Sequence, residues 1–491
     1  MKLKFKLLKL EAGRPIAFVN KGFAEQHNIH EGERIEITYN GKKLILIVDL
    51  AEQLLTNHQI SLSREATSFL GVKEGEEITV SLALSPKSTR YILKKLEGKE
   101  LNNQEIREII NAIINNSLTE AEIAYFVSGV YEHGMSFEET LSLTEAMAKT
   151  GKVLHWHSNN IADKHSIGGI PGNRTTPIVI SICAAAGIIM PKTSSRAITS
   201  AAGTADVIET LANVNLSAER LREIVKKTNA CLAWGGSLGL APADDKLIRV
   251  ERLLNIDPEA QLIASIIAKK ISAGSKHILI DIPYGNGAKV SFGEAKLLSK
   301  EFLKVASHFK LNIKVILTDG SQPIGNGLGP VLEMLDVISV LKQQNPPKDL
   351  EEKSILLAAT ILEMMKKAPK GQGRKLAKEI LTSGRALKKF NEIIDAQGRK
   401  KTLLKPAKFT RIIKSKLSGK VISIDNKSIN LLARILGCPS DHAAGIYLNK
   451  HVGNKIKREE PLLTLYSESK EKLAEGINFF NSSHPIKIKI E

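Results

Sequence analysis

Residues 163–209 read DKHSIGGIPGNRTTPIVISICAAAGIIMPKTSSRAITSAAGTADVIE, and the rest of the chain is interpreted outward from them. Near their start, Lys164 supplies a positive charge and Ser166 a hydroxyl, directly before the pair Gly168–Gly169. Paired glycines let backbone N–H groups approach a ligand closely. A helix expected to begin near Thr175–Thr176 would add its positive dipole end. The segment therefore predicts an anion site suited to phosphate; a glycine-rich turn with an incidental lysine and serine is the competing interpretation.

A second cluster, residues 193–204, carries six hydroxyl side chains and Arg196 in twelve positions. Hydroxyl groups compete with the backbone for hydrogen bonds in helices, so such density disfavours regular structure. The pattern predicts a hydrogen-bonding surface for a polyoxygenated ligand such as ribose plus phosphate. A polar loop without a ligand is the alternative.

Two further segments carry candidate cations. Ser265 and Lys269 are four residues apart on an expected helix and therefore share one face. Lys289 follows a strand end and the glycine loop of residues 284–288. Taken alone, each lysine is better explained as a surface residue.

The alternation of strands and helices around these segments predicts the fold class. Residues 278–282 and 313–317 read as buried strands, and residues 294–309 between them read as a crossover helix. This spacing is typical of an α/β sheet. We therefore expect an α/β multi-domain protein with an α/β phosphate-binding domain over residues 155–345.

The flanking segments divide into four further parts. Residues 1–84 alternate apolar and polar residues around the hairpin signal Asn40–Gly41, which predicts a β-rich barrel or sandwich. Capping boxes at Thr119–Glu122 and Ser136–Glu139 mark helices. The expected parts are a β-rich domain (1–84), part of a helical domain (85–154), a helical and basic linker region (346–407) and a C-terminal α+β domain (408–491).

The chain has 491 residues and a net charge of +18, most of it in one stretch. Residues 366–420 hold 18 Lys and Arg residues and three acids, a net +15. This suggests a nucleic-acid or anionic membrane surface. The region has only two aromatic residues for stacking on bases, so a solvated lysine-rich surface is the favoured explanation.

Cysteines and histidines give little support for a metal or a disulfide. The three cysteines are far apart, which fits a reducing cytoplasm, and we expect a cytoplasmic protein. His155 and His157 lack an acid or a third ligand at a recognisable spacing. The glycines of residues 325–329 do not match a dinucleotide fingerprint. We expect no metal and no cofactor.

The segments 164–169 and 194–209 together resemble the signature of the thymidine and pyrimidine-nucleoside phosphorylases and the related AMP phosphorylases. Residues 93–106, 419–439 and 453–469 are similar to further parts of that family, and the N-terminal β-domain resembles its longer branch. The resemblance implies a helical domain facing an α/β domain across a cleft. It also implies a homodimer or larger homo-oligomer, no metal, and inorganic phosphate as co-substrate with a nucleoside or nucleotide.

The same resemblance suggests roles for individual residues. His165 becomes a base-side catalytic candidate, and Asp257 corresponds to the proton donor of the AMP-phosphorylase branch. The remaining substrate and phosphate candidates are Lys164, Ser166, Gly169, Ser194, Ser195, Arg196, Ala197, Ile198, Thr199, Ser200, Thr204, Ser265, Lys269 and Lys289.

Base preference stays open. A thymidine phosphorylase is the leading hypothesis, and an AMP phosphorylase is the alternative. Val250 stands where shorter thymidine phosphorylases carry a base-contacting arginine, and Ile-Pro-Gly-Asn-Arg-Thr-Thr follows Gly169 as in the longer branch. A nucleic-acid-binding protein and a Mg²⁺-dependent phosphoribosyltransferase are the competing classes, and no acid pair near the glycine loop supports the latter.

Overall fold

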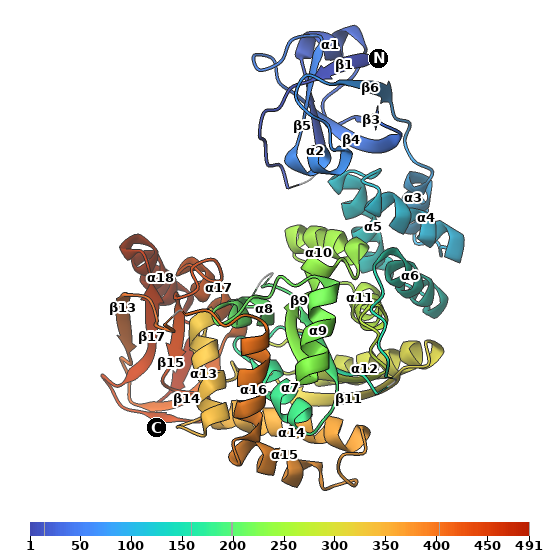
Figure 1. The fold of residues 1–491 in the computed structure, drawn as a ribbon. Helices are drawn as coiled ribbons and strands as arrows, with labels where there is room; N and C mark the ends of the chain where they lie inside the picture. Colours follow the sequence, from blue (N-terminus) through green and yellow to red (C-terminus); the bar gives the residue numbers. More distant parts are fainter. Residues whose placement is uncertain (14, 159, 198–199, 402, 491) are drawn as a thin grey trace. The chain divides into compact units, whose positions relative to one another are not determined.

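The computed structural model describes residues 1–491 apart from 14, 159, 198–199, 402 and 491. The chain divides into two compact units, Met1–Gly151 with Ala241–Ser265, and Lys152–Leu240 with Ile266–Glu491 (Figure 1). Within the described part of the chain, none of the helices combines the length and apolar character that crossing a bilayer demands.

The first unit begins with a closed six-stranded barrel whose strand order is β1-β5-β2-β4-β3-β6. Alternating side chains of these strands point inward, so one apolar core fills the barrel. The predicted hairpin is confirmed, because Asn40 and Gly41 both have positive φ and join β3 to β4. The elements are β1 (Lys2–Phe5), β2 (Ile16–Val19), α1 (Lys21–Gln26), β3 (Arg34–Tyr39), β4 (Lys42–Leu50), β5 (Gln59–Leu62), α2 (Arg64–Leu70) and β6 (Glu77–Leu82).

Helices form the rest of the first unit: α3 (Ser88–Leu96), α4 (Asn103–Ile114), α5 (Glu120–His133), α6 (Phe137–Thr150) and α10 (Pro242–Leu254). The capping boxes predicted at the starts of α5 and α6 are present. The unit also contains part of α11 (Glu259–Ser272).

The division into compact units differs from one predicted domain boundary. We placed residues 155–345 in a single α/β domain, but residues 241–265 belong to the helical unit. The Lys246 ammonium explains part of this, since it donates to the carbonyls of Ile113 and Ile114 at the end of α4. A helix C-terminus is a favourable place for a cation.

The second unit is built around the parallel sheet β11-β10-β7, in which β10 is central. A parallel pair, β8 with β9, lies next to it, and the predicted crossover helix is α12. The elements are β7 (Ala162–Ser166), α7 (Thr175–Ala185), β8 (Met190–Ser194), α8 (Thr204–Glu209), α9 (Ala218–Thr228), β9 (Ala230–Trp234), the 3₁₀ helix η1 (Gly235–Leu238), β10 (His277–Tyr284), α12 (Phe292–His308) and β11 (Asn312–Asp319).

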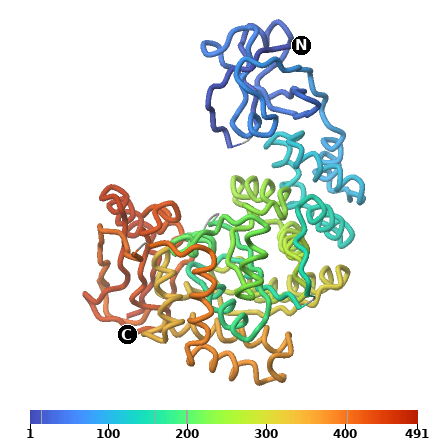
Figure 2. The backbone as a smooth tube through the Cα atoms, viewed as in Figure 1, coloured from blue at the N-terminus to red at the C-terminus, as the bar shows by residue number. Residues whose placement is uncertain are grey.

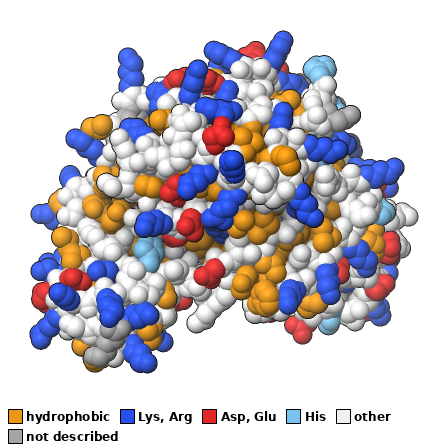
Figure 3. Space-filling model, turned by 90° about the horizontal axis from the view of Figure 1, so that it is seen from below, with side chains coloured by type: hydrophobic (Ala, Val, Ile, Leu, Met, Phe, Trp, Pro, Cys, Tyr) orange, Lys and Arg blue, Asp and Glu red, His pale blue; other side chains and the backbone are white. Residues whose placement is uncertain are grey.

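The region of residues 346–407, predicted as a helical and basic linker, contains three helices that pack into the second unit. Its helices α14 (Lys348–Met364), α15 (Gly373–Thr382) and α16 (Arg385–Ala396) supply buried residues such as Leu357, Ile380 and Phe390 to the main core. Their lysines and arginines lie mainly on the outer faces, but only six of the 18 cations of residues 366–420 lie on α15 and α16. The face in Figure 3 carries Lys and Arg side chains spread among acidic and apolar ones.

The C-terminal part of the second unit is α+β. Its sheet β12-β15-β17-β13 includes β12 from residues that precede α13, and the tube in Figure 2 shows the red end of the chain beside this yellow-orange segment. The elements are β12 (Gly327–Leu328), α13 (Pro330–Lys342), β13 (Phe409–Lys414), β14 (Gly419–Ile424), α17 (Asn426–Ile435), β15 (Gly445–Leu448), β16 (Lys455–Ile456), β17 (Pro461–Ser467), α18 (Lys470–Ser483) and β18 (Ile486–Lys489).

Replacement of the buried carboxylate Glu139 tests the packing of the helices. Glu139 pairs with buried Lys95 at 2.9 Å and accepts the backbone N–H of Leu101. In Glu139→Ala the lysine stays buried without its partner, so we expect the unit to lose about 3–5 kcal/mol of stability. In Glu145→Ala, the exposed pair with Lys149 is lost, and the cost should be roughly 0.5 kcal/mol or less. Calorimetric unfolding measures both, and equal small shifts would contradict this account.

Candidate functional site

The carboxyl end of β7 holds the first predicted residues. Lys164, His165 and Ser166 are its last three residues, and Gly168 and Gly169 follow with φ of +86° and +89°. In open α/β sheets, ligands bind outside the carboxyl ends of the strands. The local sequence therefore places these side chains where a phosphate site is expected.

Lys164 is buried and reaches the first turn of α7. Its ammonium donates to the hydroxyl of Thr175 at 2.9 Å and lies 3.5 Å from that of Thr176. Helix α7 begins at Thr175, as predicted. Burial lowers the pKa of Lys164 from 10.5 to about 8. Since the lysine occupies an acceptor position on Thr175, the O–H of that threonine is available to another acceptor.

Two serines that are predicted to bind phosphate have buried hydroxyl groups without a hydrogen-bond partner among the described residues. The Oγ atoms of Ser166 and Ser194 make no hydrogen bond within the described chain. These serines end the parallel strands β7 and β8. A salt bridge of 3.2 Å between Asp163 and Lys192 joins the two strands. A buried polar atom without a partner is costly, and a phosphate oxygen would satisfy both hydroxyls.

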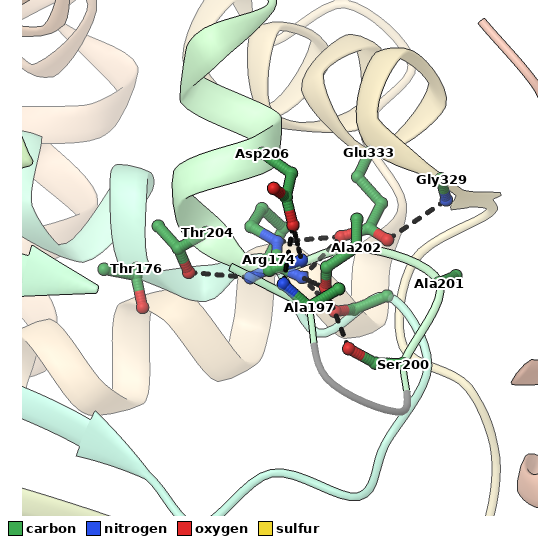
Figure 4. Close-up of polar contacts among 12 residues, drawn as sticks. Arg174, Thr176, Ala197, Ser200, Ala201, Ala202, Thr204, Asp206, Gly329 and Glu333 are labelled. Atoms are coloured by element: carbon green, nitrogen blue, oxygen red, sulfur yellow. Dashed lines mark hydrogen bonds and ion pairs between the residues drawn. The ribbon is translucent and has the colours of Figure 1, made fainter. Parts of the chain in front are cut away.

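Arg174 holds the hydroxyl cluster in place through hydrogen bonds to two of its residues (Figure 4). Its guanidinium donates to the Thr204 hydroxyl at 2.7 Å and to the Ala202 carbonyl at 2.9 Å. Its Nε donates to buried Glu333 at 2.7 Å. Burial raises the pKa of Glu333 to about 7, although Arg174 opposes this rise. With Arg174 occupying an acceptor position on Thr204, the Thr204 hydroxyl hydrogen is available to a ligand.

Asp206 fixes the turn of the loop, because its carboxylate accepts the backbone N–H of Ala197 at 2.7 Å and that of Gly203 at 2.8 Å. Gly203 is required there, since an added Cβ would lie 2.6 Å from backbone atoms of residues 195–197. Ser195 is exposed, and the Ser200 hydroxyl donates to the Ala202 carbonyl at 3.2 Å. The predicted residues Ile198 and Thr199 lie outside the described residues.

Arg196, predicted as a substrate cation, makes contacts within its own loop and the neighbouring strand. Its guanidinium pairs with Glu209 at 2.5 Å and Asp206 at 3.1 Å, and it lies over the Trp234 ring. The charge of Arg196 is therefore balanced within the protein, and in this arrangement the side chain braces the loop. Direct contact of Arg196 with a substrate stays a prediction.

The loop that contains Lys289, also a predicted substrate residue, contacts Gly169 of the glycine pair. A Cβ on Gly169 would lie 2.7 Å from Cγ of Lys289, so only glycine lets these loops approach so closely. Lys289 is exposed beside the predicted anion site, in the loop that follows β10. The structure thus brings Lys164, Gly169 and Lys289 to one edge of the sheet.

His165 lies among positive charges. Burial, together with Lys270, Lys192 and Lys269, lowers its pKa well below 6.5. The ring is therefore neutral near pH 7, which suits hydrogen bonding to a base and removes it as a cation.

The remaining predicted residues lie on or before α11. Ser265 and Lys269 are one turn apart on this helix, as predicted, and both are partly exposed. Asp257 is exposed between α10 and α11. Asp257 and Ser265 belong to the first unit, whereas Lys269 and the phosphate candidates belong to the second.

Sequence reasoning missed the buried residues behind the site. Asp163 lies between Lys270 at 2.7 Å and Lys192 at 3.2 Å, and burial lowers the pKa of Lys270 to about 7. Arg174 and Glu333 are 159 positions apart, so no local pattern pairs them. The only available signal was the position of Arg174, directly before the expected helix start. Among the described residues, no cluster of three His, Cys, Asp or Glu side chains is arranged to hold a metal ion.

Three family descriptions match successive parts of the chain. The helical bundle domain of a glycosyl transferase family matches residues 89–151, and the α/β domain of that family matches residues 158–387. The C-terminal domain of pyrimidine nucleoside phosphorylases matches residues 420–487.

Curated relatives match almost from end to end. The AMP phosphorylase of Pyrococcus furiosus is 43% identical over 100% of this chain and 98% of its own length. The AMP phosphorylase of Methanocaldococcus jannaschii is 42% identical over 99% of this chain and 97% of its own length. The chain belongs to the pyrimidine-nucleoside and AMP phosphorylase family. As a member of this family it is a pentosyltransferase of the nucleoside phosphorylase type, so the predicted resemblance is confirmed.

The comparisons do not confirm the leading thymidine hypothesis, because these full-length relatives are named for AMP. Among solved structures, anthranilate phosphoribosyltransferase from Thermus thermophilus matches 62% of this chain and 98% of its own, with a TM-score of 0.53 and 18% identity. That likeness shows a shared fold alone.

The Lys164 environment predicts a pH dependence of phosphate binding. A lysine is charged below its pKa, so with a pKa of about 8 the free site loses its charge as the pH rises through 8. The KM for phosphate should rise between pH 7.5 and 9 by roughly tenfold per pH unit at the upper end. Lys164→Gln should bind phosphate weakly at every pH, with a flatter profile. A wild-type KM that is constant over this range would contradict the assignment.

Arg174→Gln tests the orientation of the Thr204 hydroxyl. Removal of a charge-assisted hydrogen bond costs about 1.5–3 kcal/mol, so the KM for phosphate should rise by about tenfold or more. Arg399→Gln removes an exposed pair with Asp395 and serves as the control, with an expected change below twofold. Equal effects of the two substitutions on steady-state kinetics would show that Arg174 has no special role.

Proposed function

We propose that the protein cleaves AMP with inorganic phosphate to give adenine and ribose 1,5-bisphosphate. The observation that carries the proposal is the match, over the whole length of this chain, to relatives named AMP phosphorylase. This match includes the N-terminal barrel, which lies outside the three matched domain descriptions. AMP therefore replaces thymidine as the proposed substrate.

The site chemistry supports a reaction in which phosphate attacks a sugar. Lys164, the hydroxyls of Ser166 and Ser194, and the oriented hydroxyl of Thr204 form a donor set for one inorganic phosphate. The loops that contain Ser195 and Lys289 are candidates for the 5′-phosphate and ribose of the nucleotide. Two separate sets of donors suit a substrate that itself carries a phosphate.

In the proposed step, a phosphate oxygen forms a bond to C1′ while the bond from C1′ to the purine nitrogen breaks. Positive charge develops on the ribose as in glycoside cleavage, and the attacking dianion offsets it. The electron pair of the broken bond moves to adenine, which takes a proton from Asp257; solvent returns that proton to the carboxylate. Neither a metal nor a redox cofactor takes part in this balance.

A substrate screen tests the proposal. AMP, adenosine, thymidine and uridine are incubated with the protein with and without phosphate, and free base is measured by chromatography. We expect adenine from AMP only when phosphate is present, and unchanged rates in EDTA. Thymine release from thymidine at a higher kcat/KM would restore the thymidine hypothesis, and phosphate-independent adenine release would contradict phosphorolysis.

Asp257→Asn tests the proton donor. An amide cannot supply the proton, so kcat for AMP should fall by about 10²–10⁴-fold with little change in KM. The control is Glu259→Gln, at an exposed carboxylate two positions further along the chain in the first turn of α11, which should keep kcat within about twofold. Wild-type kcat in Asp257→Asn would remove the assignment.

A further inference from the structure

Helix α17 of the C-terminal α+β part contacts two candidate substrate loops. These are the Lys289 loop (residues 285–289) and the hydroxyl loop (residues 195–204). Its first residue is Asn426, and Asn430 lies four positions further, so the two side chains share one face of the helix. Each contacts a different loop of the α/β part. None of the site residues considered above lies on this helix.

Asn426 holds the loop that contains Lys289. Its side chain is fully buried, and Nδ2 donates to the carbonyls of Gly320 at 2.9 Å and Gly287 at 3.3 Å. Gly287 is two residues before Lys289, whose stem packs on Gly169. Asn426 therefore fixes the backbone that carries this lysine.

Asn430 holds the hydroxyl loop. Its Oδ1 accepts the backbone N–H of Ala201 at 3.1 Å. The Ala201 side chain is 1% exposed and belongs to the apolar core of the C-terminal part, together with Ile429 and Ala433. The loop is thus anchored at Ala201 by packing with the C-terminal part, and Arg174 holds the next residue, Ala202.

We propose that Asn426 and Asn430 are positioning residues that fix the separation of the Lys289 loop and the hydroxyl loop, and through it the binding of the nucleotide. The inference rests on the proposed function for the identity of the ligand. One turn of one helix sets the spacing, and Asp425 stabilises that turn by accepting the Ser428 N–H. The C-terminal part thereby contributes to substrate affinity through the positions of these two loops.

The substitution Asn→Asp discriminates between the two positions. At 430 it keeps the acceptor for the Ala201 N–H, so we expect near wild-type behaviour. At 426 it replaces the donor by a carboxylate facing two carbonyl oxygens in a buried place, so the contact is lost. Asn430→Ala removes the acceptor at a partly exposed position and tests the second contact in a variant expected to fold. Lys427→Ala, exposed on the same helix, is the control.

Hydrogen exchange followed by mass spectrometry tests the positioning without any substrate. Asn426→Asp should accelerate exchange in residues 285–289, and Asn430→Ala should accelerate it in residues 195–204, by at least about tenfold. Asn430→Asp and Lys427→Ala should leave both segments as in the wild type. Unchanged exchange in Asn430→Ala, or equal effects of Asn→Asp at both positions, would overturn the proposal.

Steady-state kinetics gives the functional readout. Asn426→Asp should raise the KM for AMP by about tenfold and leave the KM for phosphate within about twofold. Asn430→Ala should raise both KM values, because the loosened loop ends in the phosphate candidate Thr204, and Asn430→Asp should keep both near the wild type. In Asn426→Asp, a rise in the KM for phosphate as large as the rise in the KM for AMP would indicate general disruption and contradict a positioning role. Absence of adenine release by the wild type would refute the proposed function alone, since the exchange experiment judges the positioning independently.

Discussion

The hydrogen bonds of Arg174 are the constraint on which the geometry of the candidate site depends. This one side chain joins the start of α7, the hydroxyl loop and the start of α13 (Figure 4). Glu333 holds the guanidinium and also accepts the Gly329 N–H at 3.1 Å. The loop would otherwise be a segment of mostly small residues with many accessible conformations, which is costly to order at the moment of binding.

Buried positive charge is the second feature that defines the site. Lys164, Lys192 and Lys270 are all buried, and Asp163 is the carboxylate that pairs with two of them. Burial keeps the pKa of Lys164 and that of Lys270 low. The negative charge of a bound phosphate would therefore stabilise the charged form of these lysines. The same charges keep His165 neutral. The overall +18 of the chain contributes little here, because most of it lies in residues 366–420, which contain none of the site candidates.

Local sequence patterns predicted much of the architecture and part of the site. The hairpin at Asn40–Gly41, the capping boxes and the β10–α12–β11 unit are short-range signals, and each occurs as expected. Lys164 could be chosen because a glycine pair follows it. The boundary at residue 241 was missed, because an amphipathic pattern shows that a helix has a buried face but does not show its partner. Arg174 and Glu333 could not be paired for a similar reason, since their contact joins residues 159 positions apart.

The central claim is that a phosphate held at the end of β7 becomes bonded to the sugar. Incubation of the protein with unlabelled AMP and ³²P-labelled inorganic phosphate tests it most directly. The account predicts that the label appears in ribose 1,5-bisphosphate and is released with the acid-labile phosphate at C1. Unlabelled ribose 5-phosphate, formed together with adenine, would show that water attacks instead and would contradict the account.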